Sequence, residues 1–184
     1  MEFLIYLCLT ILIIFAIIIL LYGAGLLISA FGRIAPPVHS GHRLRKAIAD
    51  YIANEYPDAK TVMDIGSGWG TMVRAVAKRF PNAAVTGVEI MPVPYLYSII
   101  RCAFVKNTKI FFGNVFKYLK KTDKKFNIGI TYLLTTEMKD VEKFLMRFDV
   151  LLVLDFCLPD VKPTEKIKLH KDILGQHRLY VYKK

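Results

Sequence analysis

A glycine-rich segment in the middle of the chain constrains the fold more than any other feature. The apolar residues Thr61-Val62-Met63 are followed by Asp64-Ile65-Gly66-Ser67-Gly68-Trp69-Gly70, and a segment with helical spacing begins at Thr71. Glycines at this spacing let the backbone turn sharply, and they let it approach a ligand without obstruction by a Cβ atom. The pattern therefore predicts a buried strand, a tight turn and a helix, with a ligand site where the strand ends.

The residues around this turn indicate the class of ligand. A dinucleotide fingerprint requires glycine or alanine at position 71, where this chain has Thr71. Asp64 would repel a pyrophosphate but attract a cationic amino group. A second strand, expected at Ala84–Val88, ends in Glu89, and an acidic residue about 20 residues beyond such a loop commonly binds ribose hydroxyls. Both features favour S-adenosylmethionine, while a tight turn with no ligand is the structural alternative.

Residues 1–32 are predicted to form a membrane anchor. No charged residue occurs from Phe3 to Gly32, and about 20 apolar residues are enough to cross a bilayer. A cleavable signal peptide would have a basic leader and a shorter apolar core, whereas only Met1 and Glu2 precede this run. All 26 Lys and Arg residues follow the span, so the positive-inside rule places the remaining domain, residues 33–184, in the cytoplasm. In a eukaryotic source, the membrane could be mitochondrial.

The charge of this domain bears on its partners. Without Glu2, the chain has 26 basic and 14 acidic residues, a net charge of +12. Beside a membrane, this charge favours contact with anionic lipid headgroups. The cluster at Lys120–Lys125 is either a docking patch or, more simply, a solvated loop, and it lacks the interleaved aromatic residues of a nucleic-acid platform. Cys8, Cys102 and Cys157 are too widely spaced to indicate a disulfide framework or a zinc site.

Apolar runs of strand length alternate with helical spacing over the rest of the chain, and Leu174-Gly175-Gln176 separates the last two runs as a hairpin turn. The order predicts an α/β fold, a Rossmann-like doubly wound seven-stranded sheet with a terminal β-hairpin, preceded by one transmembrane helix. Residues 156–165 are too few for a helix between the fifth and sixth strands, which leaves little room for a substrate-binding cap. Helices are expected at 43–55, 71–80, 95–105, 115–121 and 138–147, and strands at 61–65, 84–88, 109–112, 126–131, 150–154, 166–173 and 177–182.

The glycine motif, Glu89 and the closing hairpin together resemble class I S-adenosylmethionine-dependent methyltransferases. Pro37-Val38-His39-Ser40, Glu89-Ile90-Met91-Pro92 and the anchor before a compact domain resemble the narrower FAM173 group of membrane-anchored protein lysine methyltransferases. Trp69 stands where eukaryotic members often have aspartate, and in this respect the chain is more similar to bacterial relatives. Asn114 replaces the acidic residue usual after the third strand.

The resemblance implies roles for individual residues. Asp64 would hold the amino group of the cofactor, Glu89 its ribose hydroxyls, and Asn114 an adenine amino group through the amide carbonyl. Thr131 and Tyr132, at the end of the fourth strand, would orient the amine of the methyl acceptor, with ordinary strand-end hydroxyls as the alternative. The other implied cofactor contacts are Gly66, Ser67, Gly68, Met91, Pro92, Gly113 and Val115.

The function expected is that of a membrane-anchored methyltransferase acting on lysine of a membrane-associated protein. Two alternatives stay open: a methyltransferase for a lipid or quinone-like small molecule, and a non-catalytic binding module that recruits an acidic partner. The presence of Asp64 and Glu89 argues against the module. His39 and Ser40 are expected to close the site, unless Ser40 caps the following helix. His177 has no partner that the sequence identifies.

Overall fold

The computed structural model describes residues 1–32, 40–172 and 175–184. The expected residues 33–39, including His39 and the Pro36-Pro37 connection, and the hairpin residue Leu174 lie outside this description. The strands are β1 (Thr61–Ile65), β2 (Ala84–Glu89), β3 (Thr108–Phe112), β4 (Phe126–Thr131), β5 (Phe148–Leu154), β6 (Glu165–Asp172) and β7 (Gly175–Lys183). The helices are α1 (Glu2–Gly32), α2 (His42–Glu55), α3 (Thr71–Arg79), α4 (Pro92–Cys102), α5 (Val115–Lys121) and α6 (Thr135–Glu142), with a short 3₁₀ turn, η1 (Leu145–Arg147).

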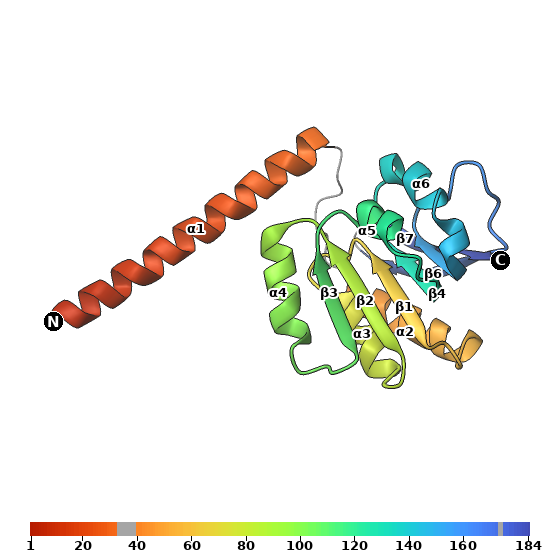
Figure 1. Ribbon diagram of the computed structural model, residues 1–184, viewed down its shortest axis with the longest axis horizontal. Coiled ribbons are helices and arrows are strands. Elements are labelled where there is room, and N and C mark those ends of the chain that lie inside the picture. Colours follow the sequence, from red (N-terminus) through yellow and green to blue (C-terminus); the bar gives the residue numbers. More distant parts are fainter. Residues whose placement is uncertain (33–39, 173–174) are drawn as a thin grey trace.

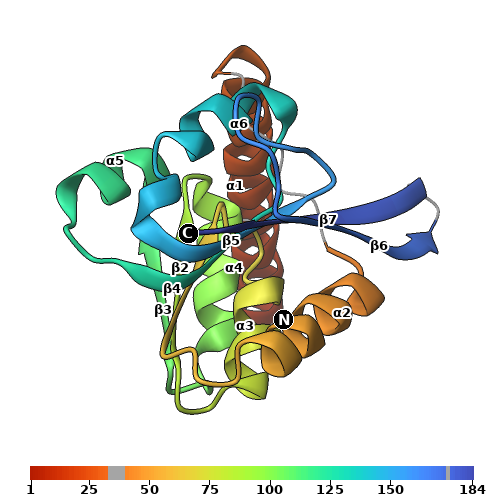
Figure 2. The same cartoon turned by 90° about the vertical axis from the view of Figure 1, so that its right-hand side faces the viewer.

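All seven strands form one sheet in the order β3-β2-β1-β4-β5-β7-β6. The pairs from β3 to β5 are parallel, and β7 runs antiparallel to both β5 and β6. Helices α2, α3 and α4 cover one face, and α5 and α6 the other (Figures 1 and 2). The predicted Rossmann-like sheet with a terminal hairpin is therefore confirmed, with no helix in residues 155–164.

Alternation along the strands builds a core on each side of the sheet. In β1, Val62 packs with α2 and α3, whereas Met63 and Ile65 pack with the α5 and α6 side. Strand β5 is buried along its apolar half from Val150 to Leu154, as expected of a central strand covered on both faces. Because β1, β2 and β4 are parallel, their carboxyl ends meet at one edge of the sheet, and the candidate site lies there.

Helices α4 and α6 each begin three residues earlier than expected. Helix α6 begins at Thr135 because Leu134 and Glu137 bond reciprocally: the Leu134 N–H donates to Glu137 Oε2 at 3.4 Å, and the Glu137 N–H donates to the Leu134 carbonyl at 3.0 Å. The continuous helix expected to reach Arg147 ends at Glu142, and η1 follows. Helix α4 begins at Pro92, a residue favoured in the first helical turn because its missing N–H costs nothing there.

Helix α1 extends away from the sheet (Figure 1). Residues 2–27 are long and apolar enough to cross a membrane, and none of the most apolar window is buried, unlike the core helix of a soluble protein. A signal sequence meets the same criteria of length and composition. Near its carboxyl end, α1 packs on α4, where Gly25 is buried and a Cβ atom on it would lie 2.8 Å from Met91 Cε. The division of the chain between residues 32 and 33 stays a prediction.

Candidate cofactor site

The glycine turn after β1 has a backbone that few other residues adopt. Gly66 and Gly68 have φ angles of 79° and 51°, in the left-handed region that glycine enters without strain. A Cβ atom on Gly66 would lie 2.6 Å from Leu133 Cδ2, whereas one on Gly68 would meet no atom within 4 Å. Gly66 therefore permits close packing against the end of β4, and Gly68 leaves open space for a ligand.

Strand β2 holds this turn in place. The Gly68 N–H donates to Glu89 Oε2 at 2.7 Å, and the Ser67 N–H donates to the Val88 carbonyl at 3.0 Å. The other carboxylate oxygen of Glu89 accepts the Met91 N–H, also at 2.7 Å. Both Glu89 oxygens are thus fixed by backbone donors, and the carboxylate is oriented before any ligand arrives.

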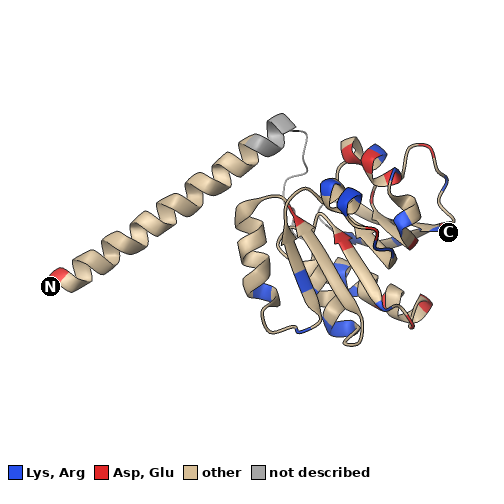
Figure 3. Cartoon of the chain, in the orientation of Figure 1, with Lys and Arg blue, Asp and Glu red and all other residues tan. Residues whose placement is uncertain are grey.

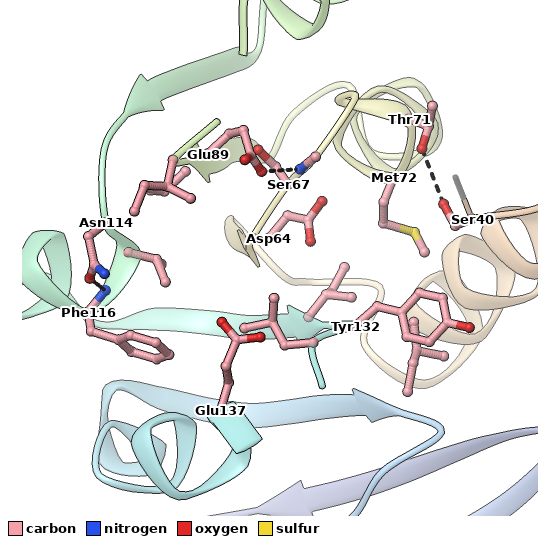
Figure 4. A pocket seen from close by; sticks show the side chains of 18 of the residues that line it. Ser40, Asp64, Ser67, Thr71, Met72, Glu89, Asn114, Phe116, Tyr132 and Glu137 are labelled. Atoms are coloured by element: carbon pink, nitrogen blue, oxygen red, sulfur yellow. Dashed lines mark hydrogen bonds between the residues drawn. The ribbon is translucent and has the colours of Figure 1, made fainter. Parts of the chain in front are cut away.

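A cleft of about 840 Å³, its open mouth included, lies above the carboxyl ends of β1, β2 and β4 (Figure 4). The structure brings most of the predicted site residues together in its lining: Asp64, Gly66, Ser67, Gly68, Glu89, Gly113, Asn114, Val115 and Tyr132.

The cleft has three acidic residues in its lining, Asp64, Glu89 and Glu137, and no basic residue among the described residues that line it. Asp64 is 5% exposed and Glu89 is 6% exposed. Burial, together with the nearby charge of Glu89, raises the pKa of Asp64 to about 8. Burial also raises the pKa of Glu89, although its backbone donors oppose the shift. Two buried carboxyl groups in one cleft fit a ligand that carries positive charge.

A buried hydroxyl supports the same fit. Ser67 Oγ is buried and has no hydrogen-bond partner within the described residues, and buried polar groups of this kind are normally satisfied. The open space beside Gly68, the orphaned Ser67 hydroxyl and the acidic pair suit an amino-acid and ribose moiety such as that of S-adenosylmethionine. The roles expected of Asp64 and Glu89, which are to bind its amino group and its ribose hydroxyls, stay predictions.

Three residues that were predicted to belong to the site do not line the cleft. Thr131 is fully buried with its hydroxyl 3.5 Å from the Ile65 carbonyl, so of the two acceptor residues only Tyr132 lines the cleft. Neighbouring strand residues point to opposite faces, which explains the difference. The Met91 side chain packs toward Gly25 of α1 and does not line the cleft, although its N–H orients Glu89. Pro92 also lies outside the lining.

Asn114 has a structural role that the sequence did not indicate. Its carbonyl oxygen caps α5 by accepting the N–H groups of Phe116 and Lys117 at 2.9 and 3.0 Å. Both lone pairs are therefore used by the helix. The predicted contact of this carbonyl with an adenine amino group stays a prediction, and it would compete with the cap.

Ser40, which was expected to help close the site, lines the cleft, and the structure adds Glu137 to the lining. Glu137 is the third residue of α6, so its carboxylate lies near the start of a helix that faces the cleft (Figure 4). Ser40 does not cap α2, whose N-cap is Gly41. Instead, its hydroxyl lies 3.2 Å from that of Thr71 and joins the segment before α2 to the start of α3. Because this helix was expected to begin at residue 138, no sequence pattern singled out Glu137.

Tyr132 packs against His177, which bonds Asp155, and the sequence did not predict this contact. Its ring lies edge-on to that of His177, with 6.3 Å between centroids. His177 is 3% exposed, and its Nδ1 is 2.8 Å from Asp155 Oδ2. Asp155 follows β5 with a positive φ of 63°, and the antiparallel pairing of β5 with β7 brings it beside His177.

Helix α1 contacts the glycine turn through aromatic rings. Trp69 lies between Tyr22 of α1 and Tyr97 of α4, with centroids 6.0 and 5.5 Å away. The turn that borders the cleft is thus in contact with the segment predicted to be the anchor.

Solved structures of other proteins share this fold. The O-methyltransferase TomG from Streptomyces achromogenes, solved in complex with SAM, superposes with a TM-score of 0.66 at 12% identity, covering 89% of this chain and 90% of that one. An RNA methyltransferase from Salinibacter ruber, in complex with S-adenosyl-L-homocysteine, gives a TM-score of 0.60 at 18% identity, covering 79% and 92%. The chain has the class I S-adenosylmethionine-dependent methyltransferase fold.

Sequence comparisons agree with this methyltransferase fold. A family model described as "Putative methyltransferase" matches residues 58–129, from the loop before β1 into β4. N-methyltransferase 4 from Papaver somniferum is 26% identical over 92 residues, which are 49% of this chain. The match spans only 26% of that relative's length. The expectation of S-adenosylmethionine as cofactor is consistent with these findings, and the narrower resemblance to the FAM173 group stays a prediction.

Proposed function

We propose that this chain is a membrane-anchored S-adenosylmethionine-dependent methyltransferase that N-methylates lysine of a membrane-associated protein. The observation that carries the proposal is the lining of the cleft, to which the carboxyl groups of Asp64, Glu89 and Glu137 all contribute. A site of this charge favours both a cationic cofactor and a cationic acceptor side chain.

Different residues of the cleft would bind different parts of the cofactor. Asp64 would hold the amino group of the cofactor, Glu89 its ribose hydroxyls, and Ser67 with Gly68 the methionine part. When bound, S-adenosylmethionine supplies an electrophilic methyl group on a positive sulfonium. Asn114 and Val115, at the start of α5, border the part of the cleft where the adenine is expected.

An acceptor amine would enter on the side of Tyr132 and Glu137. Figure 4 shows both residues across the cleft from Glu89 and Ser67, with Asp64 between the two groups. Glu137 would attract the ammonium of lysine, whose pKa in solution is about 10.4. The ammonium must lose a proton before its nitrogen can act as a nucleophile, and desolvation in the cleft favours that loss. Tyr132 would orient the amine, and alignment of the two reactants is the main contribution such a site makes.

The anchor supports a membrane-associated acceptor. Helix α1 is long and apolar enough to span a bilayer, and it contacts the domain at Trp69 and Met91. In the absence of a helix in residues 155–164, the cleft keeps an open mouth that a protein side chain can reach. The cytoplasmic placement of the domain follows from the positive-inside rule and belongs to the same proposal.

The test supplies labelled S-adenosylmethionine to membranes that contain the full chain. Label is expected in protein, and acid hydrolysis of that protein should yield methylated lysine. A Glu137→Gln variant should reduce incorporation, while an Asp140→Asn variant, which removes an exposed carboxylate from the same helix, should leave it unchanged. Label in the lipid extract would instead support the lipid or quinone alternative. No label in either fraction, from a chain that binds the cofactor, would favour the binding module.

A further inference from the structure

Exposed apolar side chains are concentrated on one side of the domain. Outside α1, and among residues described, most of the exposed large hydrophobic side chains lie between positions 96 and 112, with Leu134 and Met146 elsewhere. Those on this side are Leu96, Tyr97, Ile99, Ile100, Phe104, Phe111 and Phe112. A contiguous exposed apolar patch is typical of an interaction surface.

Helix α4 presents the centre of this patch. Leu96 and Ile100 lie four residues apart on α4, and Phe104 follows in the turn after the helix; these side chains are 55%, 70% and 96% exposed. We call these three residues the α4 stripe. The opposite side of the helix is buried through Ser98 and Cys102. Soluble helices carry polar residues on the outer face, so α4 has an apolar face that the domain itself does not cover.

The patch continues onto the edge strand of the sheet. Strand β3 lies at one end of the strand order, and Phe112 on it is 56% exposed. Its ring centroid lies 5.1 Å from that of Tyr95 in α4. The stripe and the end of β3 thus form one surface.

Basic residues accompany this surface. Between Glu89 and Asp123 the chain has no acidic residue, and Arg101, Lys106 and Lys109 lie on or next to α4 and β3. Figure 3 shows basic positions on α4 and β3 and no acidic position on α4. An apolar face bordered by lysine and arginine matches the boundary between acyl chains and anionic headgroups.

The position of α1 indicates what covers the patch. The carboxyl end of α1 packs on α4 at Gly25 and Met91, and α4 is the helix of the domain nearest to α1 (Figures 1 and 2). We propose that the α4 stripe and its flanking basic residues form a second membrane contact, which inserts into the anionic surface of the bilayer that α1 spans. The inference rests on the membrane location in the proposed function.

The experiment measures the depth of single labelled positions in the full chain. The exposed thiols are removed as Cys8→Ser and Cys157→Ser, and Cys102 is buried. An environment-sensitive fluorophore is then attached at Phe104→Cys, and the chain is reconstituted in vesicles of phosphatidylcholine and phosphatidylglycerol that contain lipids with a nitroxide near the headgroup or, in parallel samples, far along the acyl chain. Two further labels, at Ile13→Cys in α1 and Lys168→Cys on the opposite edge strand β6, are the controls.

We expect quenching at position 104 to be several-fold greater than at 168, and quenching at 13 to show that α1 spans the vesicle membrane. Lys106→Glu with Lys109→Glu should reduce quenching at 104 without changing it at 13. Quenching at 13 but not at 104 would overturn the inference and leave the anchor intact. A label at 104 that is shielded from water yet not quenched would overturn it too, because a protein partner or a second copy would then cover the stripe. Absence of quenching at 13 would contradict both the membrane anchor and this inference. Cofactor binding by the same chain would still test the proposed methyltransferase activity separately.

Discussion

Glu89 Oε2 accepts the backbone N–H of Gly68 at 2.7 Å, so the end of β2 fixes the glycine turn at the end of β1. The second carboxylate oxygen accepts the Met91 N–H. One side chain therefore sets both the shape of the turn and the start of the segment that leads into α4.

Glu89→Gln should weaken S-adenosylmethionine binding, because an amide has one acceptor oxygen for the two N–H groups and presents an NH₂ group to one of them. A hydrogen bond to a charged group contributes about 1.5–3 kcal/mol, so the dissociation constant should rise about 10-fold to 150-fold. Calorimetric titration of the full chain in nanodiscs measures it. The matched control is Glu165→Gln, which changes a carboxylate on β6 that pairs with Lys183 of β7. This variant should bind the cofactor normally. Unchanged affinity in Glu89→Gln would contradict the assigned role.

The stability of the cofactor-free protein should fall as pH rises toward 8. Burial and the charge of Glu89 raise the pKa of Asp64 from 3.8 to about 8, so between these values the folded state binds a proton that the unfolded state has lost. The contribution of Asp64 to stability is complete below pH 4 and is lost as pH rises through about 8, with a slope of at most about 1.4 kcal/mol per pH unit.

Thermal unfolding from pH 5 to pH 9 tests this dependence, and Asp64→Asn should flatten it. Asp123→Asn, at a fully exposed position, should retain the wild-type slope. Since a cationic ligand favours the ionised carboxylate, cofactor binding at pH 7 should also release protons, which titrations in buffers of different ionisation enthalpy would detect. A flat profile in the wild-type protein would exclude this titration of Asp64.

Gly25→Leu should disturb the packing of α1 on α4, because a Cβ atom there already lies 2.8 Å from Met91 Cε. Overpacking of this kind typically costs about 1–3 kcal/mol. Gly23→Leu adds the same apolar volume two residues earlier, where a Cβ atom would meet nothing within 4 Å, and should be tolerated. Trp69 is the chain's single tryptophan and contacts Tyr22, so its emission should change in the first variant alone. Equal spectra would show that α1 does not pack on the domain in solution.

Replacing Asp155 should separate backbone strain from side-chain bonding. Asp155 has a φ of 63°, and its carboxylate bonds His177 Nδ1 and the Arg178 N–H. Asp155→Gly and Asp155→Ala both lose these bonds, but alanine also incurs about 1–2 kcal/mol for the left-handed conformation. The alanine variant should therefore melt at the lower temperature. Both variants should lower turnover, because His177 would no longer be held against the Tyr132 ring. If alanine is the more stable variant, the positive φ is not a source of strain.

The sequence predicted the parts of the site that depend on local pattern. The strand, glycine turn and helix around Asp64 and Gly68 follow from neighbouring residues, and Glu89 follows from the end of the next apolar run. Thr131 was not separated from Tyr132, because the face each occupies depends on the register of β4 beside β1. The bond between Asp155 and His177 requires the non-local pairing of β5 with β7, which spacing alone does not specify.

The direct packing of α1 on α4 has a consequence for how acceptors are found. Under the proposed function, the enzyme and its acceptor diffuse in the same plane, so their encounter is a two-dimensional search at a raised effective concentration. Because Gly25 is buried against the domain, the mouth of the cleft stays at one height above the bilayer. Identical lysines at other heights would then escape methylation, and a series of rigid helical spacers beneath one target lysine would show a single height of greatest modification.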